Sequence, residues 1–99
     1  MHTERRRLLT IVTEATLEHR LIRDIERLGA LGYTIIDVRG KGSHGVRDSR
    51  WEGSGNIRVE IVCDAARADA IAGHLKESYE NFAMILFIGD VDVLCPVQL

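Results

Sequence analysis

The chain has 99 residues, with 13 lysines and arginines against 15 aspartates and glutamates, and a formal net charge of −2. Hydrophobic residues make up 45% of it and charged residues 28%, as in an ordinary globular protein, so residues 1–99 are expected to form a single domain. The charge balance argues against nucleic acid or an anionic membrane as a general partner, and no apolar run is long enough to span a bilayer.

The start of the chain and its cysteines indicate a cytoplasmic protein. The sequence MHTERRRLL lacks the apolar region and the small-residue cleavage site of a secretory signal. Cys63 and Cys95 form no C-x-x-C pair, and we expect both thiols to be reduced. No metal site is predicted, because the four histidines are not spaced as metal ligands are.

The first part of the chain predicts a strand followed by a helix. Residues 8–13, LLTIVT, are apolar and β-branched, as in a strand. Thr13 or Thr16 is the expected N-cap of the helix that follows, and Gly29 supplies its expected end. Apolar side chains recur at helical spacing in this segment, at Leu17, Leu21, Ile25 and Leu28.

The rest of the chain predicts two strands, a helix and a last strand. Residues 33–39 form the first of these strands and residues 56–63 the second. Asp64 is expected to cap a helix over residues 65–80, and residues 83–94 predict the last strand, with a break expected near Gly89. The strand over residues 56–63 alternates cleanly, with one apolar face made of Ile57, Val59, Ile61 and Cys63.

The predicted order of elements is therefore βαββαβ. This order is typical of the α+β class with a ferredoxin-like fold, in which both helices cover one face of an antiparallel sheet. The other sheet face is too apolar to stay fully hydrated, so we expect it to pack against further copies of the chain. Its residues include Thr10, Val12, Glu60 and Val62.

The connection over about residues 40–55 is far longer than an ordinary hairpin loop, and loops of that length are usually functional or disordered. Its closely spaced glycines allow consecutive backbone N–H groups to wrap an anion, and its arginines can bind phosphate or carboxylate through two hydrogen bonds. The cationic residues are Lys41, Arg47 and Arg50.

Two sequence segments carry a resemblance to a known family. The motif GYTIIDVRGKGS, followed by the long loop and then IRVEIV, resembles the PII signalling proteins over residues 8–94. The pattern GKGSHGVR is most similar to the PII-like proteins linked to bicarbonate uptake and carboxysomes. The resemblance implies a homotrimer that binds adenine nucleotides in clefts between subunits, at the base of the long loop, which is called the T-loop. Residues 95–99, which contain the only proline, are expected to form a loose C-terminal tail.

The resemblance assigns residues to the nucleotide site and to two further roles. Tyr33 and Thr34 would lie along the adenine or ribose, and Arg47 would reach the phosphates. The base of the phosphate cradle would be Gly40, Lys41, Gly42 and Ser43. The cleft would be lined from the sheet by Val12, Glu60 and Val62. Candidates for a bicarbonate site are Arg47, Arg50 and Arg58. Trp51 is a candidate anchor for a partner protein, because tryptophan is frequent at binding hot spots.

Departures from the family pattern favour ADP or AMP over ATP. Nitrogen-regulatory PII proteins hold the ATP phosphates with a glycine-rich loop containing lysine and with an arginine-rich tail. Here the corresponding segments are YENFAM and VLCPVQL, which contain neither.

The sequence therefore predicts a regulatory protein without catalytic residues, cofactor or metal. Ligand-dependent ordering of the T-loop would control a target in inorganic-carbon metabolism, with a bicarbonate transporter or a carboxysome component as candidates. Two alternatives stay open: a small trimeric enzyme of ferredoxin-like fold, and an interaction module that binds no nucleotide.

Overall fold

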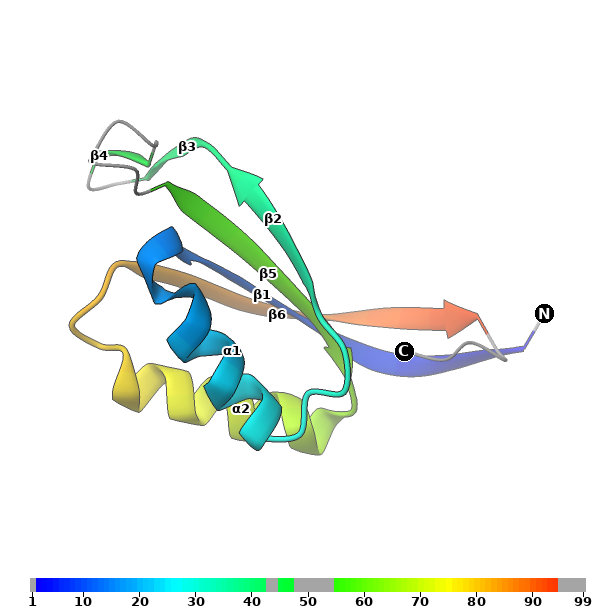
Figure 1. Ribbon diagram of the computed structural model, residues 1–99. Coiled ribbons are helices and arrows are strands. Elements are labelled where there is room, and N and C mark those ends of the chain that lie inside the picture. The colour runs from blue at the N-terminus through cyan, green and yellow to red at the C-terminus, as the bar shows by residue number, and fades with distance from the viewer. Residues whose placement is uncertain (1, 43–44, 48–54, 95–99) are drawn as a thin grey trace.

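The computed structural model describes residues 2–42, 45–47 and 55–94, and the side chains of residues 2–40 and 55–94. An antiparallel sheet has the strand order β2-β5-β1-β6, and helices α1 and α2 lie on the same face of it (Figure 1). The strands are β1 (Thr3–Glu14), β2 (Thr34–Val38), β5 (Asn56–Cys63) and β6 (Met84–Leu94), and the helices are α1 (Glu18–Arg27), preceded by the 3-10 turn η1 (Ala15–Leu17), and α2 (Ala65–Ser78). The predicted ferredoxin-like α+β fold is confirmed.

The start of the long loop contains a small antiparallel pair of strands. Strand β3 (Gly40–Gly42) pairs with β4 (Gly45–Arg47), and the register sets Gly40 opposite Arg47. Figure 1 shows this pair at one end of β2, whereas the connection between α1 and β2 lies at the other end.

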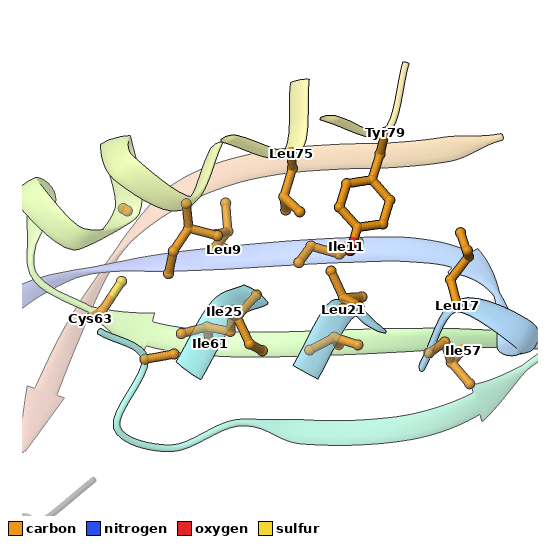
Figure 2. Close-up of a cluster of buried hydrophobic side chains, with 14 residues drawn as sticks. Leu9, Ile11, Leu17, Leu21, Ile25, Ile57, Ile61, Cys63, Leu75 and Tyr79 are labelled. Carbon is orange, nitrogen blue, oxygen red and sulfur yellow. The ribbon is translucent and has the colours of Figure 1, made fainter. Parts of the chain in front are cut away.

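The core lies between the sheet and the two helices. Strand β5 alternates as predicted, with every second side chain buried from Ile57 to Cys63. These side chains meet Leu9 and Ile11 of β1 and the buried stripes of both helices, as Figure 2 shows. The helical stripes include Leu21, Ile25, Ala68, Ile71 and Leu75.

The predicted ends of the helices are confirmed for α2 and partly wrong for α1. Asp64 caps α2, since its Oδ1 accepts a hydrogen bond from the backbone N of Arg67 at 2.8 Å. Gly29 follows α1 with a φ of 102°, a conformation that glycine adopts at little cost.

Neither Thr13 nor Thr16 caps α1, because Thr13 precedes the turn η1 and Thr16 lies within it. Thr13 Oγ1 instead donates to the carbonyl of Ala83 at 2.9 Å, and Thr16 Oγ1 donates to Glu14 Oε1 at 3.0 Å. The N-cap position of α1 belongs to Leu17, which has no side-chain hydrogen bond to offer.

Replacing Asp64 with alanine is expected to lower the free energy of unfolding by about 1 kcal/mol, the usual cost of losing an N-cap. Asp64→Asn keeps a capping oxygen and should stay within about 0.5 kcal/mol of the wild type. Urea unfolding of the two variants measures the difference, and equal stability of the two would show that the cap contributes nothing.

Strand β1 starts earlier than the sequence predicts, and β6 is continuous where a break is expected. Strand β1 starts at Thr3 rather than at residue 8, and β6 passes through Gly89 without a break. Beyond the end of β5 they continue as a two-stranded ribbon (Figure 1). Charges of opposite sign face each other along it, with Arg5 Nε 2.7 Å from Asp92 Oδ1 and Arg7 Nη1 2.9 Å from Asp90 Oδ1.

The sheet face away from the helices carries large apolar side chains. Phe87 is 55% exposed and Ile85 is 42% exposed, and the register sets them opposite Thr10 and Val12 of β1. We name this surface the open face. As predicted, it also carries Glu60 and Val62, which lie opposite Thr10 and Leu8. An apolar surface of this kind is typical of an interface with another protein chain.

Candidate functional site

A cavity of about 320 Å³ opens on the open face, near the start of β2. Four of the residues assigned to the nucleotide site line it: Tyr33, Thr34, Glu60 and Val62. Strand β5 places Glu60 opposite Thr34, and β1 places Leu8 opposite Val62. We name this hollow the Tyr33 cavity.

The Tyr33 cavity combines an apolar wall with hydrogen-bonding groups. Leu8 and Val62 supply the wall, and the Thr34 hydroxyl and the Glu60 carboxylate supply a donor and acceptors. The hydroxyl of Tyr33 donates to Glu26 Oε2 of α1 at 3.2 Å. Loss of hydration, together with this bond to Glu26, raises the pKa of Tyr33. A flat heteroaromatic ring with polar edges fits this combination of groups.

Sequence reasoning did not assign Leu8 and Gly32, which also line the cavity. Leu8 could have been found, because it alternates with Thr10 and Val12 along one face of β1. Gly32 precedes the assigned pair of residues directly.

The assigned residues Val12 and Gly40 lie towards the opposite end of the sheet. Thr34 and Gly40 are six positions apart along an extended chain, which corresponds to about 20 Å. Val12 lies on the open face opposite Arg58, but four positions from Leu8, or about 13 Å along the strand. A single chain therefore does not bring all the assigned residues to one small ligand.

The structure does not describe the side chains of several assigned residues. Of Lys41, Gly42 and Arg47 the structure describes the backbone alone, in β3 and β4. The assignments to Ser43, Arg50 and Trp51 fall outside the described residues, as does the proposed loose tail over residues 95–99.

Arg58, a candidate for binding bicarbonate, lies beside an acidic neighbour. Its Nε is 3.4 Å from Glu60 Oε2, yet this nitrogen is buried without a well-formed hydrogen bond. Arg58 does not line the Tyr33 cavity. A bicarbonate ion bound to Arg58 would have to compete with the carboxylate of Glu60.

A cavity larger than the Tyr33 cavity, of about 490 Å³, lies between α2 and β6, and none of the assigned residues lines it. Its apolar floor comes from Leu75, Phe82, Met84 and Leu86. The chemistry expected of a nucleotide site is therefore found in the smaller Tyr33 cavity.

A cluster of titratable side chains joins α1 to α2. His74 lies between Asp24 and Ser78, with Nε2 3.3 Å from Asp24 Oδ2 and Nδ1 3.4 Å from Ser78 Oγ. The same Asp24 oxygen accepts the hydroxyl of Tyr79 at 2.6 Å. Neither His74 nor Ser78 lines the Tyr33 cavity or the cavity between α2 and β6, and the contact of His74 with Asp24 links the two helices.

Within the described part of the chain, no group of three or more histidine, cysteine, aspartate or glutamate residues is arranged to hold a metal ion. No helix among the described residues has the length and apolar character needed to cross a membrane.

Comparison with known proteins gives a consistent result. The family model for nitrogen regulatory protein P-II matches residues 6–97. A proposed PII-like signalling protein from Thermus thermophilus has 39% sequence identity and a TM-score of 0.79, over 95% of this chain and 94% of that one. CPII from Thiomonas intermedia, in a structure with ADP, AMP and bicarbonate, has 22% identity and a TM-score of 0.84, over 93% of this chain and 91% of that one. The GlnK–ATP complex from B. subtilis has 18% identity and a TM-score of 0.65, over 88% and 84% of the two chains.

Proposed function

This chain belongs to the PII family, and from that premise we propose that it is a cytoplasmic, non-enzymatic sensor of an adenine nucleotide. The family resemblance seen in GYTIIDVRGKGS and IRVEIV is thereby confirmed. The protein is a PII-like regulatory protein. The observation that carries the proposal is the Tyr33 cavity. It brings Tyr33, Thr34, Glu60 and Val62 together around a space suited to a heteroaromatic base.

The proposed assembly is a homotrimer with the nucleotide between subunits. The exposed apolar side chains of the open face support an interface there. The distance of about 20 Å between Thr34 and Gly40 supports a shared site, because one ligand would have to meet the Tyr33 cavity of one subunit and the glycine segment of its neighbour.

ADP or AMP is the proposed effector, with bicarbonate as a second ligand. The similarity of the fold to CPII, which was observed with ADP, AMP and bicarbonate, supports this choice and the proposed place in the bicarbonate-linked branch of the family. Arg47, Arg50 and Arg58 are the proposed anion ligands, and the competing carboxylate of Glu60 makes Arg58 the weakest of the three.

The proposed mechanism is a shift in the population of T-loop conformations. A nucleotide that binds one conformation better than the others favours it by the difference in binding free energy, typically about 1–3 kcal/mol. The favoured loop would then bind or release a target in inorganic-carbon metabolism, such as a bicarbonate transporter or a carboxysome component, with Trp51 as the candidate anchor.

Calorimetric titration with AMP, ADP, ATP and cyclic AMP, each with and without bicarbonate, tests the proposal. We expect micromolar binding of AMP or ADP, weaker binding of ATP, and a change in affinity when bicarbonate is present. Analysis of the titrated solution for nucleotide breakdown separates a sensor from an enzyme, because only an enzyme would convert the ligand. Absence of binding across the panel would contradict the proposal and favour an interaction module.

A further inference from the structure

A second cavity adjoins the Tyr33 cavity and carries two arginines. It has a volume of about 260 Å³, and Val62 lines both cavities. Arg6 enters it from β1 and Arg67 from α2. Arg6 is two residues from Leu8 on the same face of β1, so the two cavities follow one another along that strand. We name the second hollow the arginine cavity.

The side chain of Arg67 is held in place from two sides. Its Nη1 donates to Asp64 Oδ2 at 2.5 Å, while its backbone N donates to Asp64 Oδ1. On the other side its side chain packs against Gly29, where an added Cβ would lie 2.9 Å from Arg67 Nε. Glycine thus leaves the space that this arginine fills. Because its rotamer is already restricted, Arg67 loses little conformational entropy when it binds a ligand.

Both guanidinium groups have hydrogen-bond donors to spare. Arg6 donates to the carbonyl of Arg5 at 3.0 Å and to the carboxylate of Glu4. A guanidinium carries five N–H groups, so these contacts and the bond from Arg67 to Asp64 leave several unused. The carboxylates of Glu4 and Asp64 reduce the net charge of the cavity, but the remaining N–H donors of the two arginines stay unused. A ligand with several acceptor oxygens, such as a phosphate, suits it better than a simple halide.

The position of the arginine cavity relates it to the proposed nucleotide. Gly40 lies about 20 Å from Thr34 along the extended chain, too far to reach the anionic end of a ligand held by the same chain. Among the described side chains, Arg6 and Arg67 are the cations of a cavity that adjoins the Tyr33 cavity. We propose that Arg6 and Arg67 bind the phosphate of the adenine nucleotide whose base occupies the Tyr33 cavity. This inference rests on the proposed function and names residues that neither the sequence motifs nor the family resemblance assigned.

Comparison of AMP with adenosine isolates the phosphate contribution. Calorimetric titrations of both ligands with Arg67→Gln and Arg6→Gln should show AMP affinity reduced about tenfold or more, the effect of losing a charge-assisted hydrogen bond. Adenosine affinity should change less than about twofold, since the base and ribose contacts remain. Arg23→Gln is the matched control, because Arg23 is exposed on α1 and lines neither cavity. Its affinities for both ligands should equal those of the wild type.

The other outcomes of these titrations separate a failure of this inference from a failure of the proposed function. If the wild type binds AMP and both variants bind it equally well, this inference is wrong while the proposed function stands. A parallel loss of AMP and adenosine would also overturn it, since it would indicate a general disturbance of the site. A wild type that binds neither ligand would contradict the proposed function together with the inference. Arg6 and Arg67 are partly exposed, at 35% and 45% of their side chains, so glutamine should be tolerated, and urea unfolding checks that it is.

Discussion

Replacing Phe87 with glutamate is expected to convert the proposed trimer to monomers and to weaken nucleotide binding at least about a hundredfold. Phe87 is 55% exposed in the single chain and lies on the open face, opposite Thr10. In a trimer built on this face the side chain would be buried, and each subunit would bring one carboxylate into the interface. Burying an unpaired carboxylate costs several kcal/mol, and a closed trimer would incur that cost at every subunit.

Sedimentation velocity measures the expected change in mass directly. Ala70→Glu is the matched control, since Ala70 is exposed on α2, on the helical side of the sheet. It adds the same charge and should leave the trimer intact. Far-UV circular dichroism of the Phe87 variant should match the wild type, because this side chain is outside the core of the single chain. A Phe87→Glu protein that remains trimeric, or a wild type that is monomeric, would show that the open face is not the interface.

The same substitution tests whether the nucleotide site needs two subunits. If the Tyr33 cavity and the glycine segment of a neighbour both contact the ligand, a monomeric variant should bind AMP at least about a hundredfold more weakly, as expected when several contacts are lost together. A monomer that keeps wild-type affinity would mean that the Tyr33 cavity and the arginine cavity of one chain suffice.

The spacing of apolar residues in the sequence predicted the strands and helices well, because a buried face requires apolar side chains at regular positions. In β5 a shift of one residue would turn Ile57, Val59 and Ile61 to the open face, so the register follows from the pattern alone. The N-cap of α1 was predicted wrongly because Thr16, one of the two expected caps, lies within the 3-10 turn η1 and donates to Glu14. The start of β1 was missed because its pattern is ionic: Arg5 and Arg7 are recognisable as strand residues only beside Asp92 and Asp90.

The candidate site was predictable only in part, and mainly from the family resemblance instead of from the spacing of apolar residues. Tyr33 and Thr34 were assigned from the family resemblance, since nothing in their own chemistry distinguishes them from ordinary strand residues. Leu8 was within reach of simple alternation along β1. Arg67 was not, because its place depends on the contact with Gly29, which is 38 positions away in the sequence and becomes a neighbour only when α1 and α2 pack together.

Replacing Tyr79 with alanine is expected to lower the free energy of unfolding by about 3–5 kcal/mol, as large aromatic truncations in cores do. Tyr79 is 2% exposed, and its ring packs beneath the guanidinium of Arg20, whose central carbon is 4.4 Å from the ring centroid. The ring of Phe82 also packs against Tyr79, with the two ring centroids 6.0 Å apart. Since a domain of this size is commonly stable by about 5–15 kcal/mol, the alanine variant should lose a large share of its stability.

Tyr79→Phe separates the ring from the hydroxyl. It should cost about 1–2 kcal/mol, because only the hydrogen bond to Asp24 Oδ2 is lost and the ring remains. Urea unfolding at pH 7 gives both values. A phenylalanine variant as unstable as the alanine variant would mean that the bond to Asp24, and not the packing of the ring, holds the two helices together.

The dependence of stability on alkaline pH gives an independent test of the Tyr79 hydroxyl. Burial and the hydrogen bond to Asp24 raise the pKa of Tyr79 from 10.0 to about 12. The unfolded chain therefore loses this proton first, and the stabilisation is complete below pH 10 and disappears as the pH rises towards 12. The difference in stability between the wild type and Tyr79→Phe should shrink over that range, because the phenylalanine variant has no proton to lose. A difference that stays constant would mean that the hydroxyl titrates normally and that the contact with Asp24 is not maintained in solution.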